Sequence, residues 1–80
     1  MMKERVLDMT LDEAIEAFQP HRWKFYSVEE SKVKVEVPRG LGESFVVEFP
    51  YASDAQRDET TRKLHEAGFR KQTVRVTSEW

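Results

Sequence analysis

Hydrophobic and polar residues alternate over three segments in the middle of the chain, and this alternation predicts three β-strands. The segments are residues 23–28, 32–37 and 45–49, and the first of them is rich in aromatic residues. A period of two with a single apolar side is typical of strands that bury one face. The positions expected to face the core in the second and third strands are Val33, Val35, Val37, Phe45, Val47 and Phe49.

Segments whose apolar residues recur with helical spacing precede and follow these strands. Residues 11–19 carry apolar side chains at the i, i+3, i+4, i+7 spacing, and Thr10 with Glu13 forms a capping-box signature at their start. A second helix is predicted from about residue 54 to residue 67, and Gly68 suits the left-handed position that ends a helix. The spacing therefore predicts two helices, one before and one after the strands.

The remaining segments complete a topology. Residues 38–44 are expected to be a loop, and residues 72–77 alternate as a final strand. In residues 3–9 the alternation of apolar and polar residues is too brief to decide whether they form a strand. We expect one domain over residues 1–80: an α+β fold of order (β)αβββαβ, with an antiparallel sheet of four or five strands and both helices on one face, as in ferredoxin-like two-layer sandwiches.

The sheet face opposite the helices, which we call the open face, is expected to be solvated and polar. It follows from the alternation that this face would display Lys24, Tyr26, Lys32, Lys34, Glu36, Val46, Glu48, Thr73 and Arg75.

The amino-acid composition excludes several classes of functional site. The 80 residues include no cysteine, which excludes disulfides, thiolate catalysis, zinc ribbons and iron–sulfur clusters. The charged N-terminal residues predict no signal peptide, and no stretch approaches the roughly 18 apolar residues of a membrane span. A cytoplasmic protein that binds no membrane is expected.

Candidate catalytic and metal-binding groups are few. His21 and His65 are isolated and lack the spacing of a ligand pair, and Ser44 lacks the flanking glycines of a nucleophile elbow. The glycines at 40 and 42 have no lysine at P-loop spacing. No enzyme activity, cofactor or metal site is therefore predicted.

The charge is nearly balanced overall but unevenly placed. The net charge is −2, yet residues 1–19 hold five acids against two bases and residues 57–75 hold six bases against three acids. Whether the basic cluster has a function is not decided by the sequence. Its members are Arg62, Lys63, Arg70 and Lys71.

Trp23 stands in a run of cations that begins at His21 and ends at Lys24. One interpretation makes this run a contact for nucleic acid or an acidic partner. The other, which we favour from the pattern, places Trp23 in the core of the first predicted sheet strand.

Residues 39–42 lead into the strand at 45–49, and a helix and an alternating strand follow. This succession resembles the RNA-recognition motif, and the strand at 45–49 is similar to that family's RNP1 strand. Ser44 and Val46 stand where the family places stacking aromatics. The resemblance thus implies the two-layer fold more than it implies RNA binding.

Two functions remain open. The first is a non-enzymatic protein–protein interaction module, such as a small adaptor, regulator or inhibitor of the kind found among phage and accessory proteins, with self-association as a further alternative. Its candidate contact residues are Tyr26, Val46, Arg75 and Trp80. The alternative is a degenerate domain similar to the RNA-recognition motif that binds single-stranded nucleic acid, through Lys24, Tyr26, Lys32, Lys34, Arg39 and Arg75.

Overall fold

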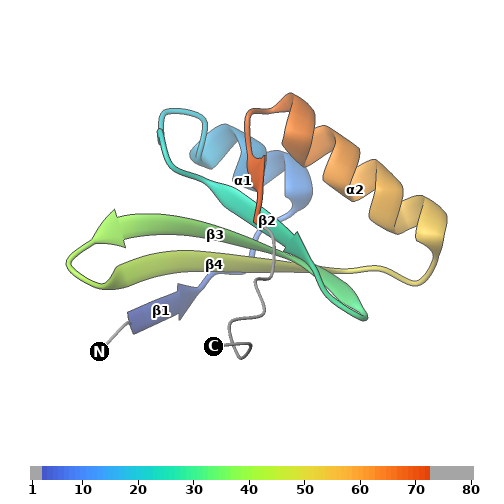
Figure 1. Cartoon of the computed structure of the whole chain (residues 1–80), viewed down its shortest axis with the longest axis horizontal. Helices are drawn as coiled ribbons and strands as arrows, with labels where there is room; N and C mark the ends of the chain where they lie inside the picture. The colour runs from blue at the N-terminus through green and yellow to red at the C-terminus, as the bar shows by residue number, and fades with distance from the viewer. Residues whose placement is uncertain (1–2, 73–80) are drawn as a thin grey trace, which may run out of the picture.

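The computed structural model describes residues 3–72, and in them a single sheet is covered by two helices (Figure 1). The N-terminal stretch that the sequence left undecided contains a strand, whereas most of the predicted strand at 72–77 lies outside the described residues. In chain order the elements are β1 (Lys3–Val6), α1 (Leu11–Ala17), β2 (Phe25–Val28), β3 (Lys32–Gly40), β4 (Glu43–Pro50), α2 (Asp54–Glu66) and β5 (Arg70–Lys71).

The sheet is mixed, with strand order β1-β4-β3-β2-β5. The hairpins β2–β3 and β3–β4 are antiparallel, but β1 pairs parallel to β4 and β5 pairs parallel to β2. Among these strands only β3 runs against the others. The prediction of an antiparallel sheet was therefore wrong, and the ferredoxin-like order is not confirmed. The physical reason is that each helix carries the chain back along the sheet, so that the strands on either side of a helix run in the same direction.

The loop predicted at residues 38–44 is mostly strand. Pairing between β3 and β4 continues to Gly40 opposite Glu43, with one irregularity before it, and leaves a turn of two residues. Leu41 and Gly42 have φ angles of 57° and 77°, the positive values that two-residue hairpin turns require. Because the turn takes only two residues, the two strands continue up to it. The glycines and the proline of this segment had suggested a longer loop.

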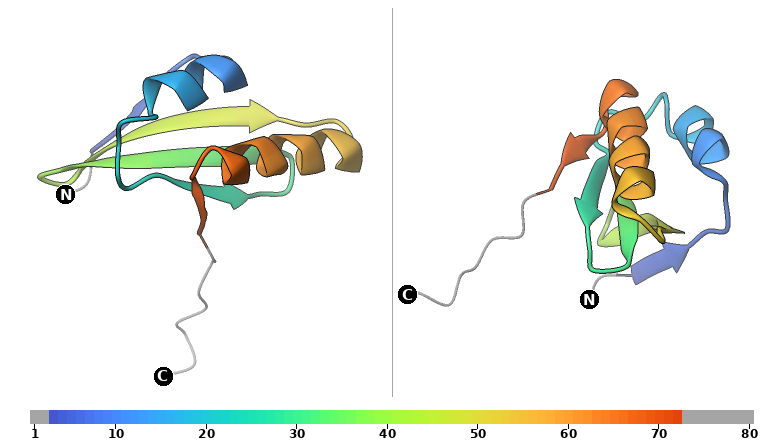
Figure 2. Two further views of the ribbon diagram at one scale, coloured as in Figure 1. Left: turned by 90° about the horizontal axis from the view of Figure 1, so that it is seen from above. Right: turned by 90° about the vertical axis from the view of Figure 1, so that its right-hand side faces the viewer.

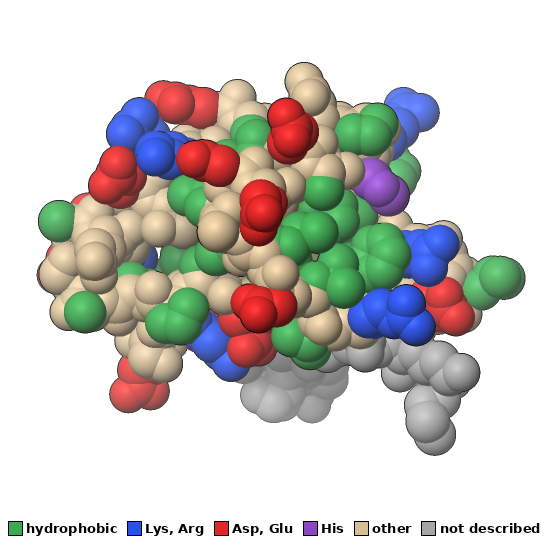
Figure 3. Space-filling model, turned by 180° about the vertical axis from the view of Figure 1, so that it is seen from behind, with side chains coloured by type: hydrophobic (Ala, Val, Ile, Leu, Met, Phe, Trp, Pro, Cys, Tyr) green, Lys and Arg blue, Asp and Glu red, His purple; other side chains and the backbone are tan. Residues whose placement is uncertain are grey.

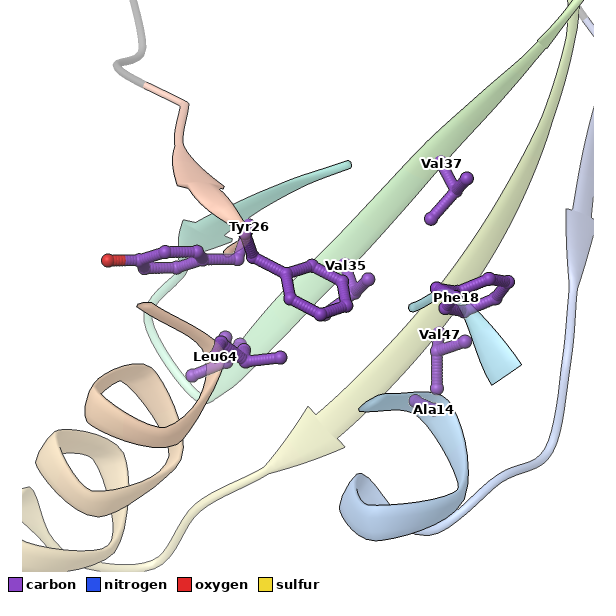
Figure 4. Packing of buried hydrophobic residues seen from close by; sticks show 9 residues of the cluster. Ala14, Phe18, Tyr26, Val35, Val37, Val47 and Leu64 are labelled. Carbon is purple, nitrogen blue, oxygen red and sulfur yellow. The ribbon is translucent and has the colours of Figure 1, made fainter. Parts of the chain in front are cut away.

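The core lies between the helices and one face of the sheet (Figure 4). Figure 2 shows both helices on the same side of the sheet, as the sequence predicts. The valines of β3 are fully buried there, which confirms the period of two in that strand. The buried cluster comprises Ala14, Phe18, Tyr26, Val33, Val35, Val37, Val47, Leu64 and Phe69.

Both helices begin at the caps that the sequence predicts. The Thr10 hydroxyl accepts a hydrogen bond from the Glu13 amide (3.2 Å), and the Glu13 carboxylate accepts one from the Thr10 amide (2.9 Å). The Ser53 hydroxyl caps α2, and Gly68, with a φ of 95°, follows its end. Neither helix of the described segment is long and apolar enough to span a bilayer.

Candidate interaction surface

Strand β2 presents the opposite face to the one that the sequence predicts. Tyr26 lies across from Val35, a core residue, and is only 6% exposed. Figure 4 shows its ring beside Leu64 of α2. The prediction that Tyr26 lies on the open face, available to a protein or a nucleic acid, was wrong, because its register with β3 places it under the helices.

Lys24 follows the same inverted alternation and is 8% exposed. Its ammonium group donates hydrogen bonds to the carbonyl oxygen of His21 (2.8 Å) and, at 3.4 Å, to that of Gln19. It also lies 5.6 Å from the ring centre of Phe69. Lys24 therefore ties the turn after α1 to the core, and its predicted place on the open face was wrong.

Because the alternation from residue 23 to residue 26 is the reverse of the predicted one, Trp23 lies on the surface. It is 49% exposed, so the interpretation that placed it in the core was wrong. The guanidinium carbon of Arg70 lies 4.9 Å from the Trp23 ring centre, and that of Arg22 lies 5.7 Å from it. We call these three residues the Trp23 surface. Because Arg70 begins β5, the surface joins the segment before β2 to the last described strand.

The two arginines of the Trp23 surface differ from the cations of α2. Within residues 3–72 neither Arg22 nor Arg70 forms an ion pair, whereas Arg62 pairs with Glu66 and Lys63 with Glu59. The structure thus divides the predicted basic cluster. Arg62 and Lys63 are neutralised along the helix, Arg70 contacts Trp23, and Lys71 is exposed.

The open face is less solvated than predicted. Val46 lies on it, across from Glu36, yet is only 1% exposed. The neighbouring Ser44 is also buried, and its hydroxyl donates a hydrogen bond to the Glu36 carboxylate (3.3 Å). Val46 was therefore placed on the correct face but wrongly expected to be accessible.

The remaining candidates for nucleic-acid binding do not gather into one site. The Lys32 ammonium contacts the Glu48 carboxylate at 2.9 Å, and this hydrogen bond raises the pKa of Lys32 above its ordinary value. The Arg39 guanidinium covers the Phe45 ring at 4.6 Å. Lys34 is half-buried on the open face. Arg75 and Trp80 lie outside the described residues.

One hollow of about 310 Å³ lies between α2 and the edge of β2. Arg57, which lines it, is held by Asp54 (3.3 Å) and Asp58 (3.2 Å), and these partners raise the pKa of its guanidinium, Asp58 first. The described residues contain no group of three side chains suited to holding a metal ion. The full lining is Tyr26, Val28, Arg57, Asp58, Thr61 and Lys71.

The Trp23 surface is the arrangement that the strand pattern missed. The signal was present as the run of cations around Trp23, but an aromatic residue next to a predicted strand is usually assigned to the core. Comparisons of the chain with protein-family models, with curated proteins and with solved structures found no match.

Proposed function

We propose that this protein is a non-enzymatic protein–protein interaction module that contacts its partner through the Trp23 surface. The observation that carries the proposal is a half-exposed tryptophan in contact with two arginines that form no ion pair with any other described residue. Tryptophan and arginine are the residue types that contribute most to binding energy at protein interfaces. A cytoplasmic setting and the role of a small adaptor, regulator or inhibitor belong to the same proposal.

The chemistry of the surface suits an acidic protein segment. The indole ring offers apolar area, and the guanidinium groups of Arg22 and Arg70 can each donate hydrogen bonds to a carboxylate. Both groups are already held beside the ring, so less side-chain freedom is lost when a partner binds.

Binding of single-stranded nucleic acid is the second candidate, and one observation favours it. An exposed indole beside arginines can stack on a base while the arginines contact phosphates. The net charge of −2 and the burial of Lys24 and Tyr26 weigh against it. A binder of this kind would show affinity that falls steeply with salt.

Site-specific photo-cross-linking in cells of the source organism tests the proposal. A photoreactive side chain is placed at Gln72, an exposed position two residues after Arg70 and therefore on the same side of the strand, and the control probe is placed at Asp54, at the start of α2. We expect a protein adduct at position 72 that is absent at position 54 and is lost on Trp23→Ala. The purified partner should then bind the Trp23→Ala variant about tenfold more weakly than the wild type.

Three results would overturn the proposal. An adduct that nuclease removes would identify nucleic acid as the partner. Identical adducts at positions 72 and 54 would show contact without a defined surface. An adduct that survives Trp23→Ala would show that the Trp23 surface is not the contact.

A further inference from the structure

The same molecule carries an acidic surface that complements the Trp23 surface. Asp8, Asp12 and Glu16 are exposed, and none of them forms an ion pair within the described part of the chain. Asp12 and Glu16 are four residues apart on α1, so they lie on one side of the helix, roughly 6 Å from each other. Figure 3, which views the molecule from the side of α1, shows acidic side chains across the middle of this face.

From this complementarity we infer that the partner on the Trp23 surface is a second copy of this chain, which presents Asp12 and Glu16 of α1. The inference rests on the proposed function and names its partner. Arg22 and Arg70 both lie within 5.7 Å of the centre of the same indole ring. Two carboxylates one helical turn apart can pair with two guanidinium groups that contact the same ring.

Charge neutralisation elsewhere in the molecule supports this pairing. Most cations of α2 and the β3–β4 hairpin are paired with acids of the same chain, as in Arg62 with Glu66 and Arg39 with Glu43. The exposed groups that form no ion pair within residues 3–72 include Asp12 and Glu16 of α1 and the two arginines of the Trp23 surface, besides Arg5, Glu30 and Lys71. Surfaces of opposite charge on two identical molecules attract each other, and added salt screens this attraction.

Each copy carries one surface of each sign, which fixes the forms that the assembly can take. A two-fold dimer would make the contact twice, once in each direction, whereas a head-to-tail arrangement would continue into a chain. Individual exposed ion pairs contribute little, so we expect a weak association that depends on both charges and on burial of Trp23.

Sedimentation of the full chain over a concentration series tests the inference by charge reversal. We expect the wild type to self-associate at low salt, with an affinity that falls about tenfold or more at high salt. The variants Arg22→Glu/Arg70→Glu and Asp12→Lys/Glu16→Lys should each be monomeric. An equimolar mixture of the two variants should associate again, because each then carries the complement of the other.

A matched control separates the specific surface from net charge. Glu30→Lys/Glu66→Lys changes the net charge by the same amount as Asp12→Lys/Glu16→Lys but alters neither surface, so self-association should persist. Circular dichroism establishes that each variant is folded, and all the substituted positions are exposed.

The outcomes distinguish this inference from the proposed function. A wild type that stays monomeric at low salt overturns the inference, while a cross-link from position 72 to a different protein leaves the proposed function standing. Folded variants that fail to associate when mixed also overturn the inference. So does self-association that neither salt nor the charge reversals alter. A nuclease-sensitive cross-link overturns the proposed function, and the inference with it.

Discussion

At the scale of single residues, Lys24 explains how a charged side chain is accommodated in a small core. Its ammonium group reaches backbone carbonyl oxygens of the turn after α1, while its Cε lies over Gly68, 3.7 Å from the position that a Cβ would take at that residue. The charge therefore has hydrogen-bond acceptors at the edge of the core, and no carboxylate is needed.

Replacing Lys24 by methionine should lower the free energy of unfolding. The substitution keeps most of the side-chain volume but leaves the His21 carbonyl without its donor, which we expect to cost about 1–2 kcal/mol. Urea unfolding measures the effect. Lys63→Met, at an ion-paired position on α2, is the control and should change stability by less than about 0.5 kcal/mol. Equal losses in the two variants would show that the hydrogen bonds of Lys24 add nothing.

Val46 and Val6 form a matched pair on the open face. They are register partners in β4 and β1, yet Val46 is 1% exposed and Val6 is 64% exposed. Val46→Ala should lower the free energy of unfolding by about 2 kcal/mol, whereas Val6→Ala should lower it by less than about 0.5 kcal/mol. Chemical denaturation of both variants checks this difference, and similar values would mean that Val46 is accessible in solution.

At the scale of elements, the β3–β4 turn holds a leucine in an unfavourable conformation. Leu41 is fully exposed and has a φ of 57°, a region that residues with a branched or bulky side chain rarely adopt. Leu41→Asn should raise the free energy of unfolding by about 0.5–1 kcal/mol, because asparagine tolerates this conformation in hairpin turns. Leu41→Ala, the control, should raise the free energy of unfolding very little. Thermal unfolding of both variants measures the difference. A gain of equal size in both variants would assign the effect to loss of the exposed leucine instead.

The elements that the sequence predicted well are those specified by local rules. The capping hydrogen bonds of Thr10 and Ser53 and the alternation through Val33, Val35 and Val37 depend on neighbours in the chain, and the structure confirms them. Strand β2 was different. It has four residues, and its adjacent aromatic side chains, Phe25 and Tyr26, supply apolar groups to both faces, so only its register with β3 selects the buried one.

Neither the direction of the edge strands nor the Trp23 surface could be predicted from the sequence, for a related reason. The pairing of β1 with β4 and of β5 with β2 joins segments far apart in the chain, and a short strand carries no local mark of its direction. The contact between Trp23 and Arg70 exists only because β5 returns alongside β2. The sequence could flag Trp23 but not the second arginine beside it.

At the scale of the whole molecule, both ends of the described chain form edges of the sheet. β1 lies at one edge and β5 at the other, and Figure 1 shows them on opposite sides of the hairpins. The segment leading into β2 and the start of β5 hold the Trp23 surface, whereas α1, on the covered face, holds Asp12 and Glu16. The fold therefore separates charges of opposite sign that a second molecule can bring together.

This separation predicts that folding and association respond differently to salt. In dilute solution, the thermal unfolding midpoint should move by less than about 5 °C between about 0.05 M and about 0.5 M NaCl, because exposed ion pairs contribute little to stability. At low salt the midpoint should rise with protein concentration, since association stabilises the folded state by mass action, and at high salt this dependence should vanish. Differential scanning calorimetry at two protein concentrations and two salt concentrations measures all four conditions. A concentration dependence that persists at high salt would point to an apolar contact between copies, in place of the charge pairing between α1 and the Trp23 surface.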